Sequence, residues 1–534
     1  MTSKQNGNPV YVISITLVAA LGGLLFGYDT AVISGAVKSL QAFFIDSLAN
    51  DTGQAQLVVS QYRMAVAAVV VLVDLALTGI FFRLYGKKMG GILVLILVVL
   101  SVIVLVRFFS NAIVFDENTA NSIKGFTISS ALVGCIIGGA AGGFISKSLG
   151  RKGGLVLAAT LFIISAIGSS IPEQMNFFGT EKIVTFIIYR IIGGMGVGLA
   201  SMLSPMYIAE MAPANIRGKL VSWNQFAIVF GMLVVYFVNY FIASQGDELW
   251  LINTGWRWMF ASEVIPAGLF LIMLAFVPET PRYLVLKGNE TKASSVLTKV
   301  LGEVKAAEVL KNIKETLVEK SVPWLSFGGF IIVIGVLLSV FQQFVGINAV
   351  LYYAPEIFRN MGSGTDTALL QTIIVGLINM AFTIIAILTV DKFGRKPLMI
   401  IGGVGMAVSM FLLGSSFYLE KVGMGALIFM LLYTASFAMS WGPVTWVLLS
   451  EIFPNSIRGA MSIAVAAQWM ANLIVSWTFP MMNDNSSLTS IFHHGFSYWI
   501  YGLMSILAAL FVWKMVPETK GKTLEEMEKL WKKK

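Results

Sequence analysis

The chain has 534 residues, of which 57% are hydrophobic and only 12% charged, and its formal net charge is +9. An average soluble domain is roughly 25% charged, whereas apolar runs of about 20 residues, long enough to cross a bilayer, recur along this whole sequence. The composition therefore excludes a soluble globular protein and predicts an all-α polytopic membrane protein. It does not indicate nucleic-acid binding, because Lys and Arg lie in short segments between the apolar runs, where they determine orientation.

The apolar runs predict fourteen spans, and no cleavage site interrupts the first, which reads as a retained helix rather than a signal peptide. The spans lie near 11–35, 62–82, 91–115, 125–146, 154–172, 183–208, 221–243, 258–277, 326–350, 368–390, 397–417, 425–449, 460–482 and 497–516. An even number places both termini on one side. The basic loops at 83–90, 147–153, 209–220 and 391–397 then place that side in the cytoplasm.

Three motifs recur at an offset of roughly 240 residues, which indicates an internal duplication. They are EMAPANIRG and EIFPNSIRG, SLGRK and KFGRK, and VPETPR and VPETKG. Two parallel halves of six spans each describe one major transporter architecture. The predicted parts are an N-terminal bundle over 1–278, a cytoplasmic linker of amphipathic helices over 279–324, a C-terminal bundle over 325–516 and a cytoplasmic tail over 517–534.

Two spans, within about 62–115, have no counterpart in the second half, and we interpret them as an inserted hairpin. A pair of spans preserves the orientation of everything that follows. Asp74 lies in this hairpin, and a neighbouring helix or a defect in the lipid could accommodate it. The single cysteine, Cys135, lies in an apolar run and predicts a packing role without any disulfide within the chain.

Asp29, in the stretch GGLLFGYDTA, is a carboxylate at membrane depth. A charge there costs about 2.5–3.5 kcal/mol even on lenient scales, so such residues are functional candidates. Arg190, near the start of RIIGGMGVG, is its expected partner, because burying a carboxylate and a guanidinium as a pair costs less free energy than burying each alone. The alternative is that Arg190 extends its side chain to the membrane interface. Glu263 is a third intramembrane ionisable group, expected to tune the pair or to cap the cavity.

Charged residues at the cytoplasmic loops predict a gate shared by the two halves, in which salt bridges rearrange between conformations. The alternative is a role in topology alone. The expected pairs are Glu210 with Arg217 and Glu451 with Arg458, and the gating set is Arg151, Glu210, Arg217, Asp391, Arg395, Glu451 and Arg458.

Neutral amides and aromatic residues gather in the second half, and Gly346, Pro355 and a Gly-Pro pair after Trp441 predict broken helices there. Amides both donate and accept hydrogen bonds, which suits an uncharged, polyhydroxylated ligand. Each amide alone could instead serve an interhelical hydrogen bond. The polar and aromatic candidates are Gln225, Gln342, Gln343, Asn348, Tyr352, Asn379, Trp441, Gln468 and Trp469.

These motifs together resemble the sugar porter family of the major facilitator superfamily over nearly the whole chain apart from about 50–118 and the linker. The resemblance rests on GGLLFGYDTAVISG, the GRK loops, YRIIGGMGVG, QQFVGINAVLYYAP, SEIFPNSIRG and VPETKGKTLEE. Several segments, such as AMSWGPV and AVAAQWMAN, are most similar to bacterial members that import D-xylose with protons. One departure is Ser146, where many members carry Asp.

The resemblance implies that Asp29 titrates the coupling proton, with Arg190 as partner and Glu263 in support. It implies that Gln225, Gln342, Gln343, Asn348, Trp441 and Gln468 bind the pentose, and that Phe26, Tyr352, Asn379 and Trp469 line the cavity. Facilitative members tend to have a neutral residue in place of Asp29.

The expected function is therefore proton-driven import of D-xylose by alternating access across a bacterial cytoplasmic (inner) membrane. No cofactor or metal is implied beyond the coupling proton, nor an obligate protein partner. The open alternatives are a symporter or facilitator for arabinose, glucose or galactose and, remotely, a sugar sensor, although the chain shows no long signalling tail. A membrane enzyme is disfavoured because no nucleophile–base set appears and the only histidines, His493 and His494, are adjacent in a loop.

Overall fold

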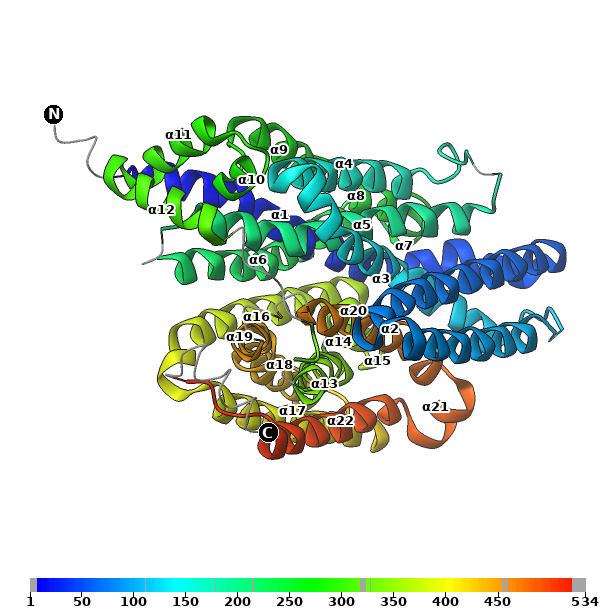
Figure 1. Ribbon diagram of the computed structural model, residues 1–534. Helices are drawn as coiled ribbons and strands as arrows, with labels where there is room; N and C mark the ends of the chain where they lie inside the picture. Colours follow the sequence, from blue (N-terminus) through cyan, green and yellow to red (C-terminus); the bar gives the residue numbers. More distant parts are fainter. Residues whose placement is uncertain are drawn as a thin grey trace.

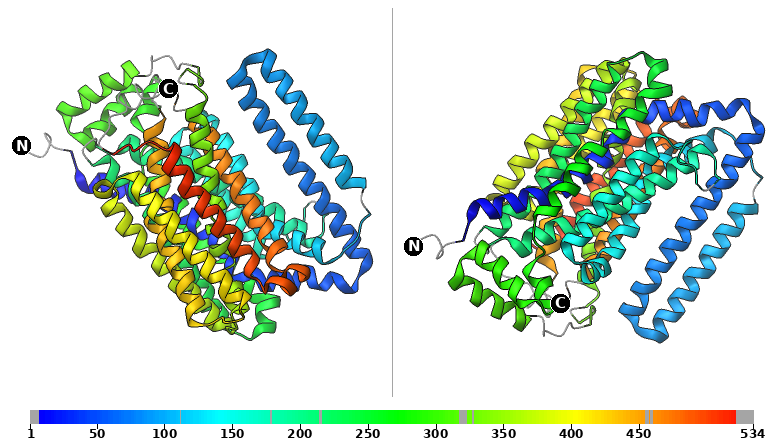
Figure 2. Two further views of the ribbon diagram at one scale, coloured as in Figure 1. Left: turned by 90° about the horizontal axis from the view of Figure 1, so that it is seen from below. Right: turned by 90° about the horizontal axis from the view of Figure 1, so that it is seen from above.

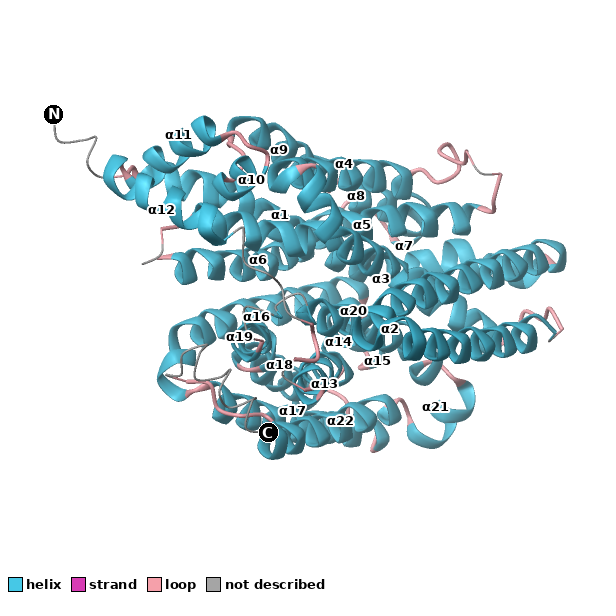
Figure 3. Ribbon diagram, in the orientation of Figure 1, coloured by secondary structure: helices cyan, strands magenta, loops and turns pink. Residues whose placement is uncertain are grey.

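The computed structural model describes every residue except 1–6, 111, 178, 214–215, 317–322, 327, 454–456, 458–459 and 521–534, together with the side chain of Asp391. Helices joined by loops, and no strand, make up these described residues (Figure 3). The predicted all-α class is therefore confirmed.

The N-terminal bundle contains the helices that precede the linker. They are α1 (Pro9–Leu40), η1 (Gln41–Ile45), η2 (Asp46–Asn50), α2 (Thr52–Ser110), α3 (Glu117–Ser148), α4 (Gly150–Ser170), α5 (Lys182–Met211), α6 (Arg217–Ala243), α7 (Glu248–Trp250), η3 (Leu251–Gly255), α8 (Trp256–Ala261) and α9 (Val264–Phe276).

The C-terminal bundle lies beside the first one, below it in Figure 1. It contains α13 (Phe330–Phe344), α14 (Ile347–Tyr352), α15 (Ala354–Asn360), α16 (Thr365–Phe393), α17 (Arg395–Tyr418), α18 (Met424–Met439), α19 (Trp441–Ile452), α20 (Met461–Asn483), α21 (Ser486–Phe492) and α22 (Gly495–Met515).

The two bundles repeat the same packing scheme. In the first, α1 packs on α6 and α4 on α5 and α9; in the second, α13 packs on α20 and α17 on α18 and α22. The bundles meet where α3 packs against α20 and where α6 packs against α16. The two contacts are equivalent, because α16 occupies in the second bundle the place of α3, and α20 the place of α6. This is the pseudo-two-fold arrangement of the major facilitator fold.

Thirteen helical segments among the described residues are long and apolar enough to cross a membrane. One of them, α2, is two helices that meet at Gly86, where φ is 70° and ψ is −176°. Ser101 Oγ donates to Asp74 Oδ1 over 3.0 Å, and Arg63 Nη2 donates to the Ala112 carbonyl over 2.7 Å, so the two arms run antiparallel. Both spans of the predicted hairpin are therefore present, and Asp74 accepts a hydrogen bond from the opposite arm.

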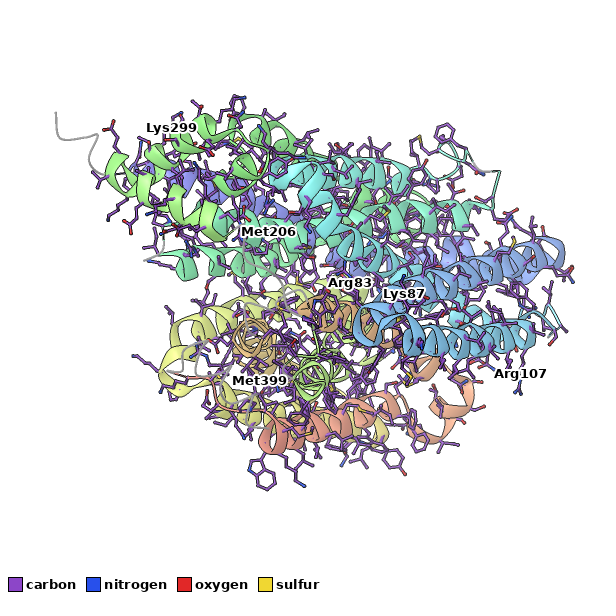
Figure 4. The ribbon with its side chains drawn as sticks, in the orientation of Figure 1. Arg83, Lys87, Arg107, Met206, Lys299 and Met399 are labelled. Carbon is purple, nitrogen blue, oxygen red and sulfur yellow. The ribbon has the colours of Figure 1, made fainter. Side chains whose placement is uncertain are left out.

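The hairpin stands beside the bundles and not within them (Figure 2). Its packing against α3, α5 and η2 involves the base, where Val58, Val59 and Tyr62 are buried. Figure 4 shows Arg83 and Lys87 together at the turn and Arg107 at the other end. Most of its remaining apolar side chains are exposed, as expected of helices surrounded by lipid.

Three short helices follow α9, namely α10 (Pro281–Leu286), α11 (Glu290–Leu301) and α12 (Glu303–Thr316). They lie within the segment 279–324, for which the sequence predicts a linker of amphipathic helices. They pack against one another and against the start of α1, where the Asn8 N–H donates to the Lys299 carbonyl over 3.0 Å. We call this end of the molecule, at the left of Figure 1, the linker end, and the other the opposite end.

Glycines bring α3 and α5 into direct backbone contact. A Cβ added at Gly194 would lie 1.7 Å from the Ala131 carbonyl oxygen, and one at Gly198 would lie 2.5 Å from that of Cys135. Small residues four apart permit such approach in membranes. This packing holds α5, and with it Arg190, against the centre of the N-terminal bundle.

Candidate functional site

Asp29 and Arg190 form an ion pair at the centre of the N-terminal bundle, as the sequence predicted. Arg190 Nη1 donates to Asp29 Oδ1 over 2.7 Å, and Nη2 donates to the Asp29 carbonyl over 3.0 Å. Both side chains are buried, α1 carrying the acid and α5 the base. Asp29 Oδ2 and Arg190 Nε have no hydrogen-bond partner, so the pair is only partly satisfied and retains capacity for a proton or a water.

Glu263 completes this charged cluster. It lies between α8 and α9, where the helix is interrupted over Ser262 and Glu263. Its side chain is fully buried and neither oxygen has a hydrogen-bond partner. The neighbouring Ser262 Oγ lies 2.7 Å from the hydroxyl of Tyr28, the residue before Asp29. Glu263 interacts electrostatically with both Asp29 and Arg190. One guanidinium therefore lies near two carboxyl groups, and a proton on either carboxyl group would remove an unbalanced charge.

The amides predicted to bind a ligand form a connected network in the C-terminal bundle. Gln468 Nε2 donates to Gln342 Oε1 over 2.5 Å, Gln343 Nε2 donates to the same oxygen over 3.2 Å, and Asn348 Nδ2 donates to Gln343 Oε1 over 2.5 Å. Gln468 Oε1 is buried and has no partner. The network therefore presents an acceptor that only a ligand, a water or a rearranged side chain could satisfy.

Broken helices position these amides, at the sites that the sequence indicated. Gly346, with φ of 94°, separates α13 from α14, and α15 begins at the residue before Pro355. Trp441 opens α19 directly after the break that ends α18. Gln342 Nε2 donates to the Trp441 carbonyl over 3.0 Å and to the Gly442 carbonyl over 3.2 Å. Interrupted helices expose such carbonyls to side chains at membrane depth.

Trp441, which the sequence placed among the sugar-binding candidates, donates its indole N–H to a backbone carbonyl of the protein. It is fully buried, and its Nε1 donates to the Met399 carbonyl on α17 over 2.9 Å. Its N–H therefore holds α17 and α19 together, and its backbone carbonyl contacts the amide network through Gln342.

Phe26 and Trp469 contact each other across the two halves, with ring centroids 5.5 Å apart. Trp469 Nε1 is buried without a hydrogen-bond partner, so this residue offers an unused donor beside the unused acceptor of Gln468. Tyr352 and Asn379 are also buried, whereas Gln225 is half-buried on α6. The aromatic contact links the helix that carries Asp29 to the helix that carries Gln468.

Among the described residues at the linker end, an arginine–glutamate pair lies in each half. Arg151 Nη2 donates to Glu210 Oε1 over 2.8 Å, and Arg395 Nη2 donates to Glu451 Oε1 over 2.8 Å. Each pair joins the first residues of one helix, α4 or α17, to the end of another, α5 or α19. The expected pairing of Glu210 with Arg217 is wrong, because Arg217 is exposed and Nη2 donates to the Ala212 carbonyl. Arg458 and the side chain of Asp391 lie outside the described residues.

Two residues of this cluster, Glu279 and Glu518, were missed as functional candidates. Glu279 accepts from the N–H groups of Arg151 and Lys152, each over 3.1 Å. Glu518 accepts from those of Arg395 over 3.1 Å and Lys396 over 3.0 Å. Both carboxylates thus cap the N-terminus of a helix, where the dipole favours negative charge. The repeated VPET motif was the signal that could have identified them.

The glycine before each GRK arginine is required by this cap. Gly150 has φ of 87° and Gly394 has φ of 92°, conformations that side-chain-bearing residues rarely adopt. A Cβ at Gly150 would also lie 2.2 Å from Glu279 Oε2, and one at Gly394 would lie 2.9 Å from Glu518 Oε2. The duplicated motifs therefore form one duplicated three-dimensional unit.

Two helical halves related by a pseudo-two-fold axis, with a buried titratable pair in one and a neutral amide network in the other, define a secondary transporter. The described residues contain no group of three or more metal-binding side chains. Comparison with known proteins agrees. The profile of the family described as "Sugar (and other) transporter" matches residues 15–114 and 101–531.

The chain belongs to this sugar transporter family. It is 54% identical to the D-xylose-proton symporter of Escherichia coli K12, over 98% of this chain and 96% of that protein. It is 38% identical to the glucose facilitated diffusion protein of Zymomonas mobilis, over 98% of each chain. The two matched segments overlap at residues 101–114, a stretch that begins in the second arm of the α2 hairpin and extends past the end of α2 at Ser110.

Solved structures of the E. coli xylose transporter XylE have the same fold. Its inward-open conformation matches with a TM-score of 0.77 at 52% identity, covering 97% of this chain and 100% of that one. A partially occluded inward-open conformation matches with a TM-score of 0.76, over 96% of this chain. These similar proteins are transporters and not enzymes.

Proposed function

We propose that this protein is a symporter that imports D-xylose together with a proton by alternating access of its two halves. The observation that carries the proposal is the buried Asp29–Arg190 pair, whose unpartnered carboxylate oxygen can take a proton. It lies one turn beyond Phe26, and Phe26 contacts Trp469 next to the amide network. This aromatic contact between the halves joins the proposed proton site to the proposed ligand site.

Protonation of Asp29 would replace a charged acceptor with a neutral one and weaken its hold on Arg190. The guanidinium would then be drawn toward Glu263 and would keep only its hydrogen bond to the Asp29 carbonyl, so the connection between α1 and α5 would weaken without being lost. Loading of the proton would in this way permit movement of the N-terminal bundle. A potential of about 100 mV contributes about 2.3 kcal/mol per charge moved, enough to support a sugar gradient of roughly 50-fold.

The ligand would be an uncharged sugar, held by Gln342, Gln343, Asn348 and Gln468 with Trp469. Gln468 Oε1 offers an acceptor and Trp469 Nε1 a donor, which match the hydroxyl groups of a sugar. On sugar binding, the hydrogen bonds between the side-chain amides of the network would be replaced by hydrogen bonds to the sugar. D-xylose is the favoured substrate because the 54%-identical relative is a symporter for that sugar.

We place the protein in the cytoplasmic membrane of a bacterium, with the linker end in the cytoplasm. The GRK loops, the linker helices and the turn of the hairpin at Arg83 and Lys87 all lie toward that end, and basic loops are retained on the cytoplasmic side. Under this proposal both termini are cytoplasmic, and residues 1–278 and 325–516 move as two bodies joined by 279–324.

The second candidate is a facilitator, or a symporter for another sugar. It is favoured by the 38% identity to a glucose facilitated diffusion protein, and opposed by the buried carboxylate of Asp29, which a facilitator does not need. Proteoliposomes with an imposed pH gradient and labelled xylose, arabinose, glucose and galactose decide between them. The proposal expects xylose to accumulate only when the gradient is present. Equilibration without accumulation would make the protein a facilitator, and preference for another sugar would change the substrate.

A further inference from the structure

A lysine that the gating set did not include joins the two halves at the opposite end. Lys124 lies in the first part of α3, and its side chain is only 4% exposed. Its Nζ donates to Asp484 Oδ2, just after α20, over 2.7 Å, and also to Glu356 Oε1 on α15. One buried ammonium of the N-terminal half thus contacts two carboxylates of the C-terminal half.

Further hydrogen bonds surround this lysine and close the same end. Asn121 Nδ2 donates to the Asp484 carbonyl over 3.2 Å, and Trp477 Nε1 donates to the Ser122 carbonyl over 3.0 Å. The carboxylate of Glu117 accepts from the N–H and hydroxyl of Ser486, each over 2.6 Å. The N-terminal two turns of α3 are thereby fastened to the end of α20 and the start of α21.

The linker end is built differently. Its arginine–glutamate pairs each lie within one half, as described above. Between described residues, two groups of hydrogen bonds and ion pairs cross from one half to the other. The first group involves α3 from its start to Lys124. The second is the bond from Tyr236, in the later part of α6, to the Leu351 carbonyl on α14. All of them lie in the half of the molecule at the opposite end, where this conformation is closed. The similarity to inward-open structures agrees.

The charges of this cluster make it sensitive to separation. A buried ammonium is strongly unfavourable without its anions, so Lys124 is stable at this depth only while the two halves are in contact. Glu356 Oε2 has no hydrogen-bond partner, and Arg359 lies one turn further along the same short helix. Opening would transfer the three charged side chains to water, so the cluster has two discrete states and can act as a switch element.

We infer that Lys124, Glu356 and Asp484 form a latch between the halves that holds the opposite end closed and must open each time sugar enters from that side. The inference rests on the proposed function for the direction of transport, and it adds residues that set the balance between the two conformations. In this balance a weaker latch favours the outward-open state.

The test measures opening directly, in right-side-out vesicles. The reporter is Ser129→Cys, a fully buried position on α3 beyond Lys124, in a Cys135→Ala background, probed with a membrane-impermeant maleimide. Lys124→Met should raise the labelling rate roughly 10-fold. Lys124→Arg, which keeps the charge, should leave it within about twofold of the parent. The matched control is Lys182→Met, because that ammonium lies 4.4 Å from the Phe43 ring of its own half.

A Lys124→Met rate equal to the parent rate would overturn the latch. Should Lys124→Met fail to fold, two other variants replace it. Asp484→Asn should raise the labelling rate. The double variant Lys124→Glu with Glu356→Lys, which exchanges the two charges, should have a labelling rate close to that of the parent. Equal rates in all of these would also reject the inference. The labelling measurement needs neither sugar nor proton, so it is independent of the proposed function. If the parent protein carries out xylose symport but Lys124→Met does not change the labelling rate, the latch alone is rejected. If Lys124→Met labels faster but the parent protein does not transport xylose, the proposed function alone is rejected.

Discussion

Arg190 holds Asp29 through two atoms of different kinds, the carboxylate Oδ1 at 2.7 Å and the backbone carbonyl at 3.0 Å. The second contact does not depend on the charge of Asp29. It keeps the guanidinium on α1 when the carboxylate is protonated or replaced. The charge of Asp29 can therefore be removed without removing the whole connection between α1 and α5.

We expect Asp29→Asn to abolish accumulation of xylose against its gradient while sugar binding and exchange persist. The amide retains the shape of the side chain but cannot take up a proton. Transport under an imposed pH gradient and counterflow in the same proteoliposomes measure the two activities. The control is Asp46→Asn in η2, which is exposed. Accumulation by Asp29→Asn at the parent level would show that the coupling proton binds elsewhere.

Gln468→Ala should weaken xylose binding by roughly 5- to 150-fold, since loss of hydrogen bonds in a buried site costs about 1–3 kcal/mol. The change removes the unpartnered acceptor Oε1 and the donor to Gln342. Binding by tryptophan fluorescence or calorimetry provides the measurement. Gln245→Ala, on an exposed residue after α6, should bind as the parent does. An unchanged affinity in Gln468→Ala would remove this residue from the sugar site.

Gly150→Ala should destabilise the folded protein by about 1–3 kcal/mol, because it places a side chain at positive φ and against the Glu279 carboxylate. Thermal unfolding in detergent gives the comparison. The matched control is Gly143→Ala on α3, where nothing lies within 4 Å of the added methyl group. A loss of stability no greater than in the control would mean that the cap has no structural role.

The cap at Glu518 predicts a pH-dependent contribution to stability. Burial would raise the pKa of the Glu518 carboxyl, but backbone N–H groups of Lys520, Arg395, Lys396 and Thr519 donate to it and hold its pKa below the ordinary value. The stabilisation is therefore fully present above the ordinary carboxyl pKa and is lost as the pH falls through the lowered one.

The stability difference between the parent and Glu518→Gln should accordingly be largest at neutral pH, at about 1–2 kcal/mol, and shrink on acidification. Melting curves between pH 7 and pH 4 report it. Glu303→Gln, on an exposed residue of α12, controls for the loss of a charge. A difference that grows as the pH falls would contradict the sign of the argument.

The hairpin predicts a labelling pattern for membrane topology. Cysteines introduced at Lys88, beside the turn, and at Asp51, before the first arm, should react from opposite faces of the membrane, Lys88→Cys from the cytoplasm. The native Cys135 is fully buried and gives a low background. Reaction of both positions from one face would show that the hairpin lies along the membrane and does not cross it.

Much of the fold and part of the site follow from local sequence. Every span needs its own apolar run, and Gly346 and Pro355 interrupt helices through their own backbone properties, so these features are visible without a structure. The Asp29–Arg190 pair was predictable for another reason. Charged residues inside the membrane are rare because they cost free energy, so the sequence offers few possible partners for Asp29.

What the sequence by itself determined, then, is the number of spans, the duplication, and the charge that had to be neutralised inside the membrane. Only the tertiary structure decided that Glu210 pairs with Arg151 and not with Arg217, that Glu279 and Glu518 cap the repeated helices, and that Lys124 spans the two halves. The physical reason is distance along the chain. Lys124 and Asp484 are separated by 360 positions, and local periodicity cannot report a contact that exists only because the two bundles pack together.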